Sequence, residues 1–178
     1  GCEDAMLDYR IRKTGHKLWQ DGTAIMWHRR RGPSRVRKQI GNYGLVRILA
    51  SNIHPEMRSW SHSAVGMFPL LSTIGIFALI FGALNGGAES SLWFTFSGDW
   101  DISRIMFHGT LGIISSYIGI CWAGALLGTS PSRTIFTILV APIMTFTLHW
   151  SYGIGVMKGW RRIRSGNSGL QIDDRKRS

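Results

Sequence analysis

The chain has 178 residues, enough for one soluble domain, but its apolar residues are gathered into long runs instead of being spread along the chain as in a soluble domain. Its formal net charge is +11, yet no recognised nucleic-acid-binding motif accompanies that excess, so nucleic acid is not an expected partner. The two cysteines, Cys2 and Cys121, are too few for a disulfide framework.

The first predicted element is a short amphipathic helix over residues 3–14, with Gly15 as its C-cap. Glu3 and Asp4 open it, where the free N–H groups and the helix dipole favour ionised carboxylates. They are either ordinary helix-start acids or a catalytic pair, since an ionised Asp facing a cleft can accept a proton from a hydroxyl. Arg10 interrupts the apolar stripe, either to pair with a carboxylate of such a site or to extend out of the core.

Two short strands are predicted next, over residues 17–20 and 23–28, joined by a turn at Asp21 and Gly22. The Asp-Gly dipeptide favours this turn because Gly adopts positive φ freely. Two strands are too few for a sheet and leave edges exposed, so we expect partner strands outside this chain. The chain is therefore expected to be the C-terminal part of a longer protein.

A helix is predicted from Arg35 onward, with Ser34 as its N-cap after the break at Gly32 and Pro33. Its polar stripe comprises Arg35, Lys38, Gln39 and Asn42, opposite Val36, Ile40, Tyr43 and Ile48. Gly41 and Gly44 each weaken the helix by about 1 kcal/mol relative to Ala, and such glycines often permit close approach of a backbone or a ligand. The alternative is a plain amphipathic helix at the membrane interface.

Three runs contain no Asp, Glu, Lys or Arg: residues 64–84, 105–127 and 134–157. Each exceeds the roughly 20 apolar residues that cross a bilayer, so residues 63–157 are predicted to be a transmembrane region with about three spans. The second run ends in a Gly124-x-x-x-Gly128 pattern, a weak signal for close helix packing.

Basic segments flank this region. Residues 1–62 carry 12 Lys/Arg against 5 Asp/Glu, and residues 158–178 carry 7 against 2, so the positive-inside rule favours a cytoplasmic location for both. Three spans, however, put the two ends on opposite sides of a membrane. Either the third run bends at Pro142 and re-enters, or the charge rule fails at this end.

The run Glu3-Asp4-x-x-Leu7-x-Tyr9-Arg10-Ile11-Arg12-Lys13-x-Gly15-x-x-Leu18-Trp19 closely resembles family 2 glycosyltransferases of the GT-A type. More narrowly, it is similar to the membrane-anchored members that build exopolysaccharide and related lipid-linked glycans. Further segments extend the resemblance: Gln39-Ile40-Gly41-Asn42-Tyr43-Gly44, His54-Pro55, and His149-Trp150-Ser151-Tyr152-Gly153.

The resemblance implies a mainly α membrane protein with a small α/β remnant. Residues 1–33 would be the C-terminal end of the GT-A catalytic domain, and residues 34–62 an interfacial helix and connector. The transmembrane region would follow over residues 63–157, and residues 158–178 would be a basic, disordered tail. The protein would lie in the inner or plasma membrane as a multi-pass protein with its catalytic part in the cytoplasm.

The resemblance also implies roles for particular residues. Asp4 would be the catalytic base, supported by Glu3. His28 would complete a site for a divalent cation, Mn²⁺ or Mg²⁺, of which imidazole suits Mn²⁺ better; the alternative is a surface His at a strand end. The acceptor or the donor diphosphate would be bound by Arg30, Arg35, Gln39, Asn42, Tyr43 and Arg47. Arg30 and its two Arg neighbours are equally explained as a positive surface beside lipid.

The implied reaction is inverting transfer of a sugar from a nucleotide-sugar donor to a lipid-linked, polyprenyl-type or glycan acceptor beside the membrane lipids. The chain alone is expected to be inactive, because the donor-binding half lies outside it. Asn42 and Tyr43 depart from the Gln-x-x-Arg-Trp motif of processive synthases, which argues against a processive polymerase. Two alternatives stay open: a processive polysaccharide synthase, and a non-enzymatic membrane subunit with a basic cytoplasmic arm.

Overall fold

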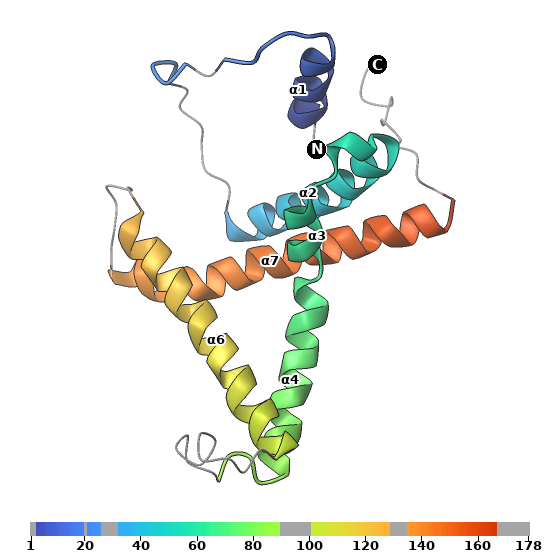
Figure 1. Cartoon of the computed structure of the whole chain (residues 1–178). Helices are drawn as coiled ribbons and strands as arrows, with labels where there is room; N and C mark the ends of the chain where they lie inside the picture. The colour runs from blue at the N-terminus through green and yellow to red at the C-terminus, as the bar shows by residue number, and fades with distance from the viewer. Residues whose placement is uncertain (1–2, 20, 26–31, 90–100, 129–134, 167–178) are drawn as a thin grey trace. The chain divides into compact units, whose positions relative to one another are not determined.

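The structure, a computed structural model, describes residues 3–19, 21–25, 32–89, 101–128 and 135–166, which are mainly helical (Figure 1). The helices in chain order are α1 (Glu3–Lys13), α2 (Pro33–Ile53), the 3₁₀ turn η1 (Pro55–Met57), α3 (Trp60–Gly66), α4 (Phe68–Leu84), α6 (Ile102–Leu127) and α7 (Ile135–Arg164). They belong to two compact units, Gly1–Met67 with Leu148–Ser178, and Phe68–Thr147.

Helix α1 ends as its sequence predicts. Gly15 has a φ of +82°, a left-handed conformation in which an L side chain is strained. The His16 N–H donates to the Ile11 carbonyl at 3.3 Å and the Gly15 N–H to the Arg12 carbonyl at 3.0 Å. These two bonds form a Schellman motif, which satisfies carbonyl groups that the last helical turn leaves without an intrahelical partner.

The predicted strands do not form in the residues that the structure describes, so the α/β remnant is not observed there. Residues 17–19 and 23–25 have neither helical nor strand structure, and residues 20 and 26–28 lie outside the described ranges. The physical reason is that a strand must pair its N–H and C=O groups with a neighbouring strand. Trp19 and Ile25 are instead 89% and 76% exposed.

The predicted turn between those segments is present. The Asp21 carboxylate accepts hydrogen bonds from the Thr23 N–H at 2.8 Å and from the Thr23 hydroxyl at 2.7 Å. The Ala24 N–H donates to the Asp21 carbonyl at 3.3 Å, which closes the turn. An Asp side chain that replaces backbone partners in this way is the usual means of stabilising such a turn.

Helix α2 begins earlier than predicted. Its N-cap is Gly32, and Pro33, not Ser34, comes next as the first helical residue. Pro suits this position because it lacks an N–H that would have no partner there, and because its φ is already helical. The Gly32 carbonyl accepts from the Arg35 and Val36 N–H groups at 3.0 and 3.1 Å. The prediction that Ser34 is the N-cap was therefore wrong.

Glycines bring α2 and the C-terminal part of α7 into backbone contact. A Cβ atom added to Gly44 would lie 3.1 Å from the Tyr152 carbonyl carbon, and one added to Gly41 would lie 3.2 Å from the Ser151 carbonyl oxygen. From the other side, a Cβ on Gly155 would lie 2.8 Å from the Gly41 carbonyl carbon. Side chains at these glycines would push the two helices apart.

The same contact surface continues toward the end of α7. A Cβ on Gly159 would lie 3.2 Å from the Leu45 carbonyl oxygen and would collide with the Ile48 side chain. A Cβ on Gly66 of α3 would lie 2.7 Å from a methyl carbon of Val156, which is fully buried. Because later residues of α2 meet later residues of α7, the two helices run parallel. We call this contact surface of α2, α3 and α7 the glycine seam.

Two helices, α6 and α7, are long and apolar enough to cross a membrane. They cover the second and third predicted spans. The first predicted span is divided at Met67 into α3 and α4, a bent pair that counts as a third crossing if it is taken as one span. Pro142 lies inside α7, which continues without interruption from Ile135 to Arg164. Of the two alternatives for the third run, re-entry through a break in the helix at Pro142 is therefore not found.

In the second unit, α4 packs against α6 through another glycine. A Cβ on Gly82 would lie 2.6 Å from the Ser103 carbonyl oxygen and 2.8 Å from the Phe107 Cβ. Gly124, in contrast, has no neighbour within 4 Å, so the predicted Gly124-x-x-x-Gly128 contact is not used within the described chain.

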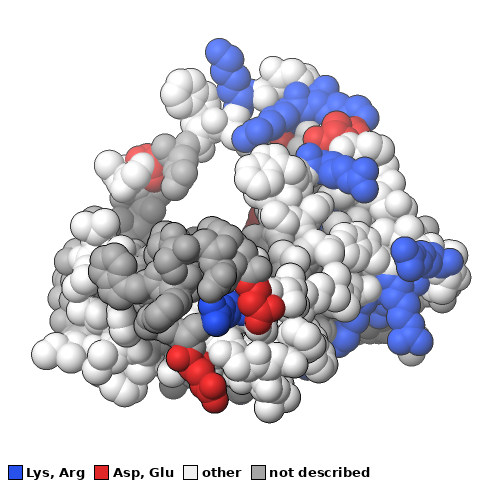
Figure 2. Space-filling view, turned by 60° about the horizontal axis from the view of Figure 1, so that its bottom comes forward, with Lys and Arg blue, Asp and Glu red and all other residues white. Residues whose placement is uncertain are grey.

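Large apolar side chains point outward from α4, α6 and the first part of α7, including Phe77, Ile113, Ile120, Phe136 and Ile143, and large areas of Figure 2 carry no charged residue. Such a surface suits lipid better than water.

Candidate functional site

The predicted catalytic pair lies in the first turn of α1. Asp4 is exposed, and Glu3 is the first residue of the helix. Asp4 is therefore accessible to solvent.

The opposite end of α1 is held against the connector between α2 and α3. The Tyr9 hydroxyl donates a hydrogen bond to Glu56 Oε1. The Tyr9 ring lies 4.8 Å from the His54 ring, and the Lys13 ammonium lies 5.6 Å from the centre of the Tyr9 ring. His54 Nδ1 is in turn 4.0 Å from Glu56 Oε1. We call these four residues the α1 latch, because they tie α1 to the connector that leads into α3.

Helix α2 carries five of the predicted binding residues. Gln39, Tyr43 and Arg47 follow one another at four-residue steps and so lie along one face. The Gln39 amide donates to the Tyr43 hydroxyl at 2.6 Å. Arg35 and Asn42 are exposed. These side chains line the helix rather than converge on one point, because Arg35 and Arg47 are about 18 Å apart along it at 1.5 Å per residue.

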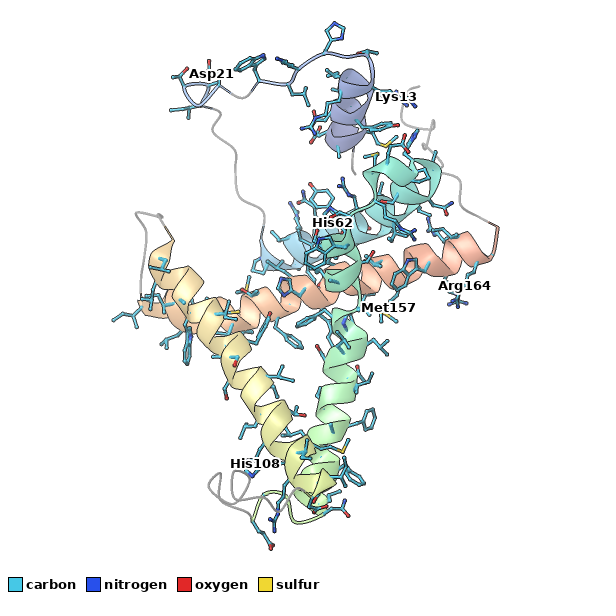
Figure 3. All side chains as sticks on the ribbon, viewed as in Figure 1. Lys13, Asp21, His62, His108, Met157 and Arg164 are labelled. Atoms are coloured by element: carbon cyan, nitrogen blue, oxygen red, sulfur yellow. The ribbon has the colours of Figure 1, made fainter. Side chains whose placement is uncertain are left out.

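Arg47 lies beside two residues that the sequence did not single out as binding residues. Its guanidinium Nε is buried and has no hydrogen-bond partner among the described residues. His62 of α3 is close enough for the Arg47 charge to act on it. The His62 ring is 6.4 Å from the ring of Tyr152 on α7, whose hydroxyl is buried. Figure 3 shows His62 where α3 meets α2 and α7. We call Arg47, His62 and Tyr152 the three-helix cluster.

The surroundings of His62 favour its neutral form. His62 precedes the apolar run, which begins at Ala64. Burial of the ring, and second the positive charge of Arg47, hold the pKa of His62 below its ordinary value of 6.5. A neutral imidazole has one N–H donor and one acceptor nitrogen. The cluster therefore presents one cation and two neutral groups that can donate.

The structure does not test the predicted metal ligand and one predicted arginine. His28 and Arg30 fall outside the described residues. Within the described ranges, no group of three or more His, Cys, Asp or Glu side chains comes together as a metal site would require. These residues therefore define no set of ligands for Mn²⁺ or Mg²⁺.

Comparisons of the chain with protein-family models, with curated proteins and with solved structures found no match. The resemblance to family 2 glycosyltransferases thus depends on the sequence motifs alone. What the structure adds is the latch on α1, the glycine seam and the three-helix cluster.

Proposed function

We propose that this chain is the acceptor-side, C-terminal part of a membrane-anchored family 2 glycosyltransferase. One observation carries the proposal: α1, which opens with Glu3 and Asp4, is tied by the α1 latch to the connector leading into the membrane-facing helices. A catalytic carboxylate on such a helix would stand near the level at which a lipid-borne acceptor ends. The nucleotide-binding half of the GT-A domain would come from sequence preceding residue 1.

In this proposal Asp4 accepts the proton of an acceptor hydroxyl as that oxygen attacks the anomeric carbon of the donor sugar. The bond from the sugar to the nucleoside diphosphate breaks, and the diphosphate leaves with the bonding electrons. Attack from the opposite face inverts the anomeric centre. Glu3 adds negative charge beside Asp4 and helps to hold the resulting proton.

The basic and polar residues would bind the charged parts of donor and acceptor. Guanidinium groups match phosphate oxygens, which suits Arg30, Arg35 and Arg47 to a diphosphate or a lipid phosphate. Gln39, Asn42 and Tyr43 would offer hydrogen bonds to sugar hydroxyls. A divalent cation, Mn²⁺ or Mg²⁺ with His28 as a ligand, would neutralise the diphosphate, and we assign no step to it.

The test is Asp4→Asn in the full-length protein at the inner or plasma membrane, with Asp8→Asn on the same helix as the matched control. Sugar transfer from radiolabelled nucleotide-sugars to extracted lipid should fall at least about a hundredfold in Asp4→Asn, because the general base is lost. Donor binding, measured by calorimetry, should be unchanged. Equal loss of binding and transfer, or equal effects of both variants, would remove the base assignment.

The product and the gene distinguish the alternatives. A single added sugar supports the proposal, whereas a long glycan supports a processive synthase. An Asp-x-Asp motif about 100 residues upstream of residue 1, a distance typical of an α/β domain, would support an enzyme. A start codon immediately upstream would instead support a non-enzymatic membrane subunit.

A further inference from the structure

Within the described residues, the guanidinium group of Arg47 is not fully hydrogen-bonded. Its Nε is buried and makes no hydrogen bond with any described residue, and no ion pair of Arg47 occurs in that part of the chain. A buried guanidinium N–H without an acceptor is costly, because it has lost water and gained no partner. The position of Arg47 therefore indicates a ligand that supplies acceptor oxygens.

The neighbours of Arg47 are suited to the same ligand. His62 and Tyr152 come from two other helices and carry an imidazole N–H and a hydroxyl, which can both donate. Neither is an anion. The acidic residue of the nearby connector, Glu56, is engaged with Tyr9 and His54 in the α1 latch. The cluster thus lacks an acid of its own.

We propose that Arg47, His62 and Tyr152 form a binding site for a phosphate group at the junction of α2, α3 and α7. A guanidinium fork can bind two phosphate oxygens, and a tetrahedral phosphate has further oxygens for donors approaching from other directions. A planar carboxylate has only two oxygens, so it could not bind all three residues as well. The inference deepens the one part of the proposed function in which Arg47 binds a phosphate, and its test requires no sugar donor and no catalytic base.

The place of the site in the chain suits a phosphate at headgroup depth. Trp60, which begins α3, is 83% exposed, and tryptophan is enriched at membrane interfaces. The uncharged run begins at Ala64, two residues after His62. The phosphate therefore comes either from a lipid headgroup or from a soluble phosphate that enters from the aqueous side.

The experiment uses the purified chain in dodecyl maltoside micelles, which contain no phosphate. Inorganic phosphate and dioleoyl phosphatidic acid are titrated separately, with oleate as an anionic lipid without phosphate. A ligand that binds the folded state raises the midpoint of thermal unfolding by an amount that grows with the logarithm of its concentration above the dissociation constant. Such stabilisation by phosphatidic acid alone identifies a lipid headgroup, and stabilisation by inorganic phosphate as well identifies a soluble source. No effect of either, or an equal effect of oleate, overturns the site.

Substitutions test which residues bind the phosphate. Arg47→Gln should weaken phosphate binding at least about tenfold, whereas Arg37→Gln removes the same charge from an exposed position of α2 and should change it less than about twofold. Tyr152→Phe removes only a hydroxyl and should weaken binding about threefold to tenfold while the fold is kept. Equal weakening by Arg47→Gln and Arg37→Gln would mean diffuse attraction to a basic surface and would overturn the inference. Because the assay contains no sugar donor, its failure is separate from failure of the transferase proposal.

Discussion

Gly44 meets Tyr152 backbone to backbone: a Cβ atom at position 44 would lie 3.1 Å from the carbonyl carbon of Tyr152. This contact has a consequence for the three-helix cluster. Arg47 lies one helical turn after Gly44 and so on nearly the same face of α2. The close approach at Gly44 therefore brings the turn of α2 that carries Arg47 close to α7. The glycine seam positions the cluster although no seam glycine carries chemistry.

The first prediction is that Gly44→Ala destabilises the first unit. The added methyl group would collide with the Tyr152 carbonyl group, and overpacking of this kind costs about 1–3 kcal/mol. The better helix propensity of Ala returns about 1 kcal/mol, so a net loss is expected. The measurement is the midpoint of thermal unfolding in detergent, followed by circular dichroism.

Gly112→Ala on α6 is the matched control for this prediction. No atom lies within 4 Å of a Cβ built at Gly112, so the change should leave stability equal or slightly higher. If Gly44→Ala is as harmless as Gly112→Ala, then α2 and α7 do not pack through the seam. The positions assigned to Arg47 and Tyr152 would then be wrong as well.

The second prediction concerns the α1 latch. An isolated helix of 11 residues is marginal in water, so α1 should depend on its contact with the connector. Tyr9→Phe removes the hydrogen bond to Glu56, which is worth about 0.5–1.5 kcal/mol. Amide hydrogen exchange in α1 should accelerate by about twofold to tenfold. Exchange in α2 should be unchanged.

Two further variants test whether the latch acts through the Tyr9–Glu56 pair. Tyr43→Phe, the control, removes a hydrogen bond to Gln39 that lies within α2, and it should not change exchange in α1. Glu56→Ala combined with Tyr9→Phe should have little more effect than either change alone, since both remove the same hydrogen bond. Fully additive effects would show that α1 is held by something else.

The sequence predicted well those features that depend on neighbouring residues. Gly15 ends α1 because only the local backbone decides a Schellman cap, and the turn at Asp21 forms for the same reason. The apolar runs became α6 and α7 because length and lack of charge are local properties. Residues 23–25, the described part of the strand predicted over residues 23–28, are not a strand, since pairing needs a partner strand and not only a favourable composition.

The three-helix cluster shows what sequence reasoning could not reach. The sequence predicts that Arg47 binds an acceptor or a diphosphate, but it predicts no binding role for His62 or Tyr152. No periodicity links α2, α3 and α7, because they are distant in the chain. Gly41 and Gly44 did indicate a close approach to α2, but the sequence did not show that α7 is the element that approaches. Asp4 and the transferase activity stay predictions.

The third prediction tests the turn before α2. The hydrogen bond from the Thr23 hydroxyl, and second that from its N–H, hold the pKa of Asp21 below its ordinary value of 3.8. The turn is thus stabilised above that value and loses the contribution as pH falls through the lowered pKa. Thr23→Val keeps the N–H and removes the hydroxyl, so the pKa of Asp21 should rise part of the way back. Carbon-detected NMR titration of the Asp21 carboxyl measures it, and an unchanged midpoint would contradict the assigned hydrogen bond.

The fourth prediction is a pH dependence that belongs to His62. Because burial and the charge of Arg47 lower the pKa of His62 in the folded chain, the unfolded chain binds the proton more readily. The contribution of neutral His62 is therefore fully present above about pH 6.5, the unfolded value, and is lost as pH falls through the lowered folded pKa. Unfolding midpoints are compared over about pH 5–8 in phosphate-free buffer for the original chain and His62→Gln. The difference in unfolding midpoint between the two proteins reports on His62 and not on the other histidines. This difference should become smaller, or change sign, at the acid end of the pH range. A difference that does not change with pH would mean that His62 is not the titrating group. Bound phosphate, by favouring protonated His62, should raise its folded pKa toward the unfolded value and so make the acid loss smaller.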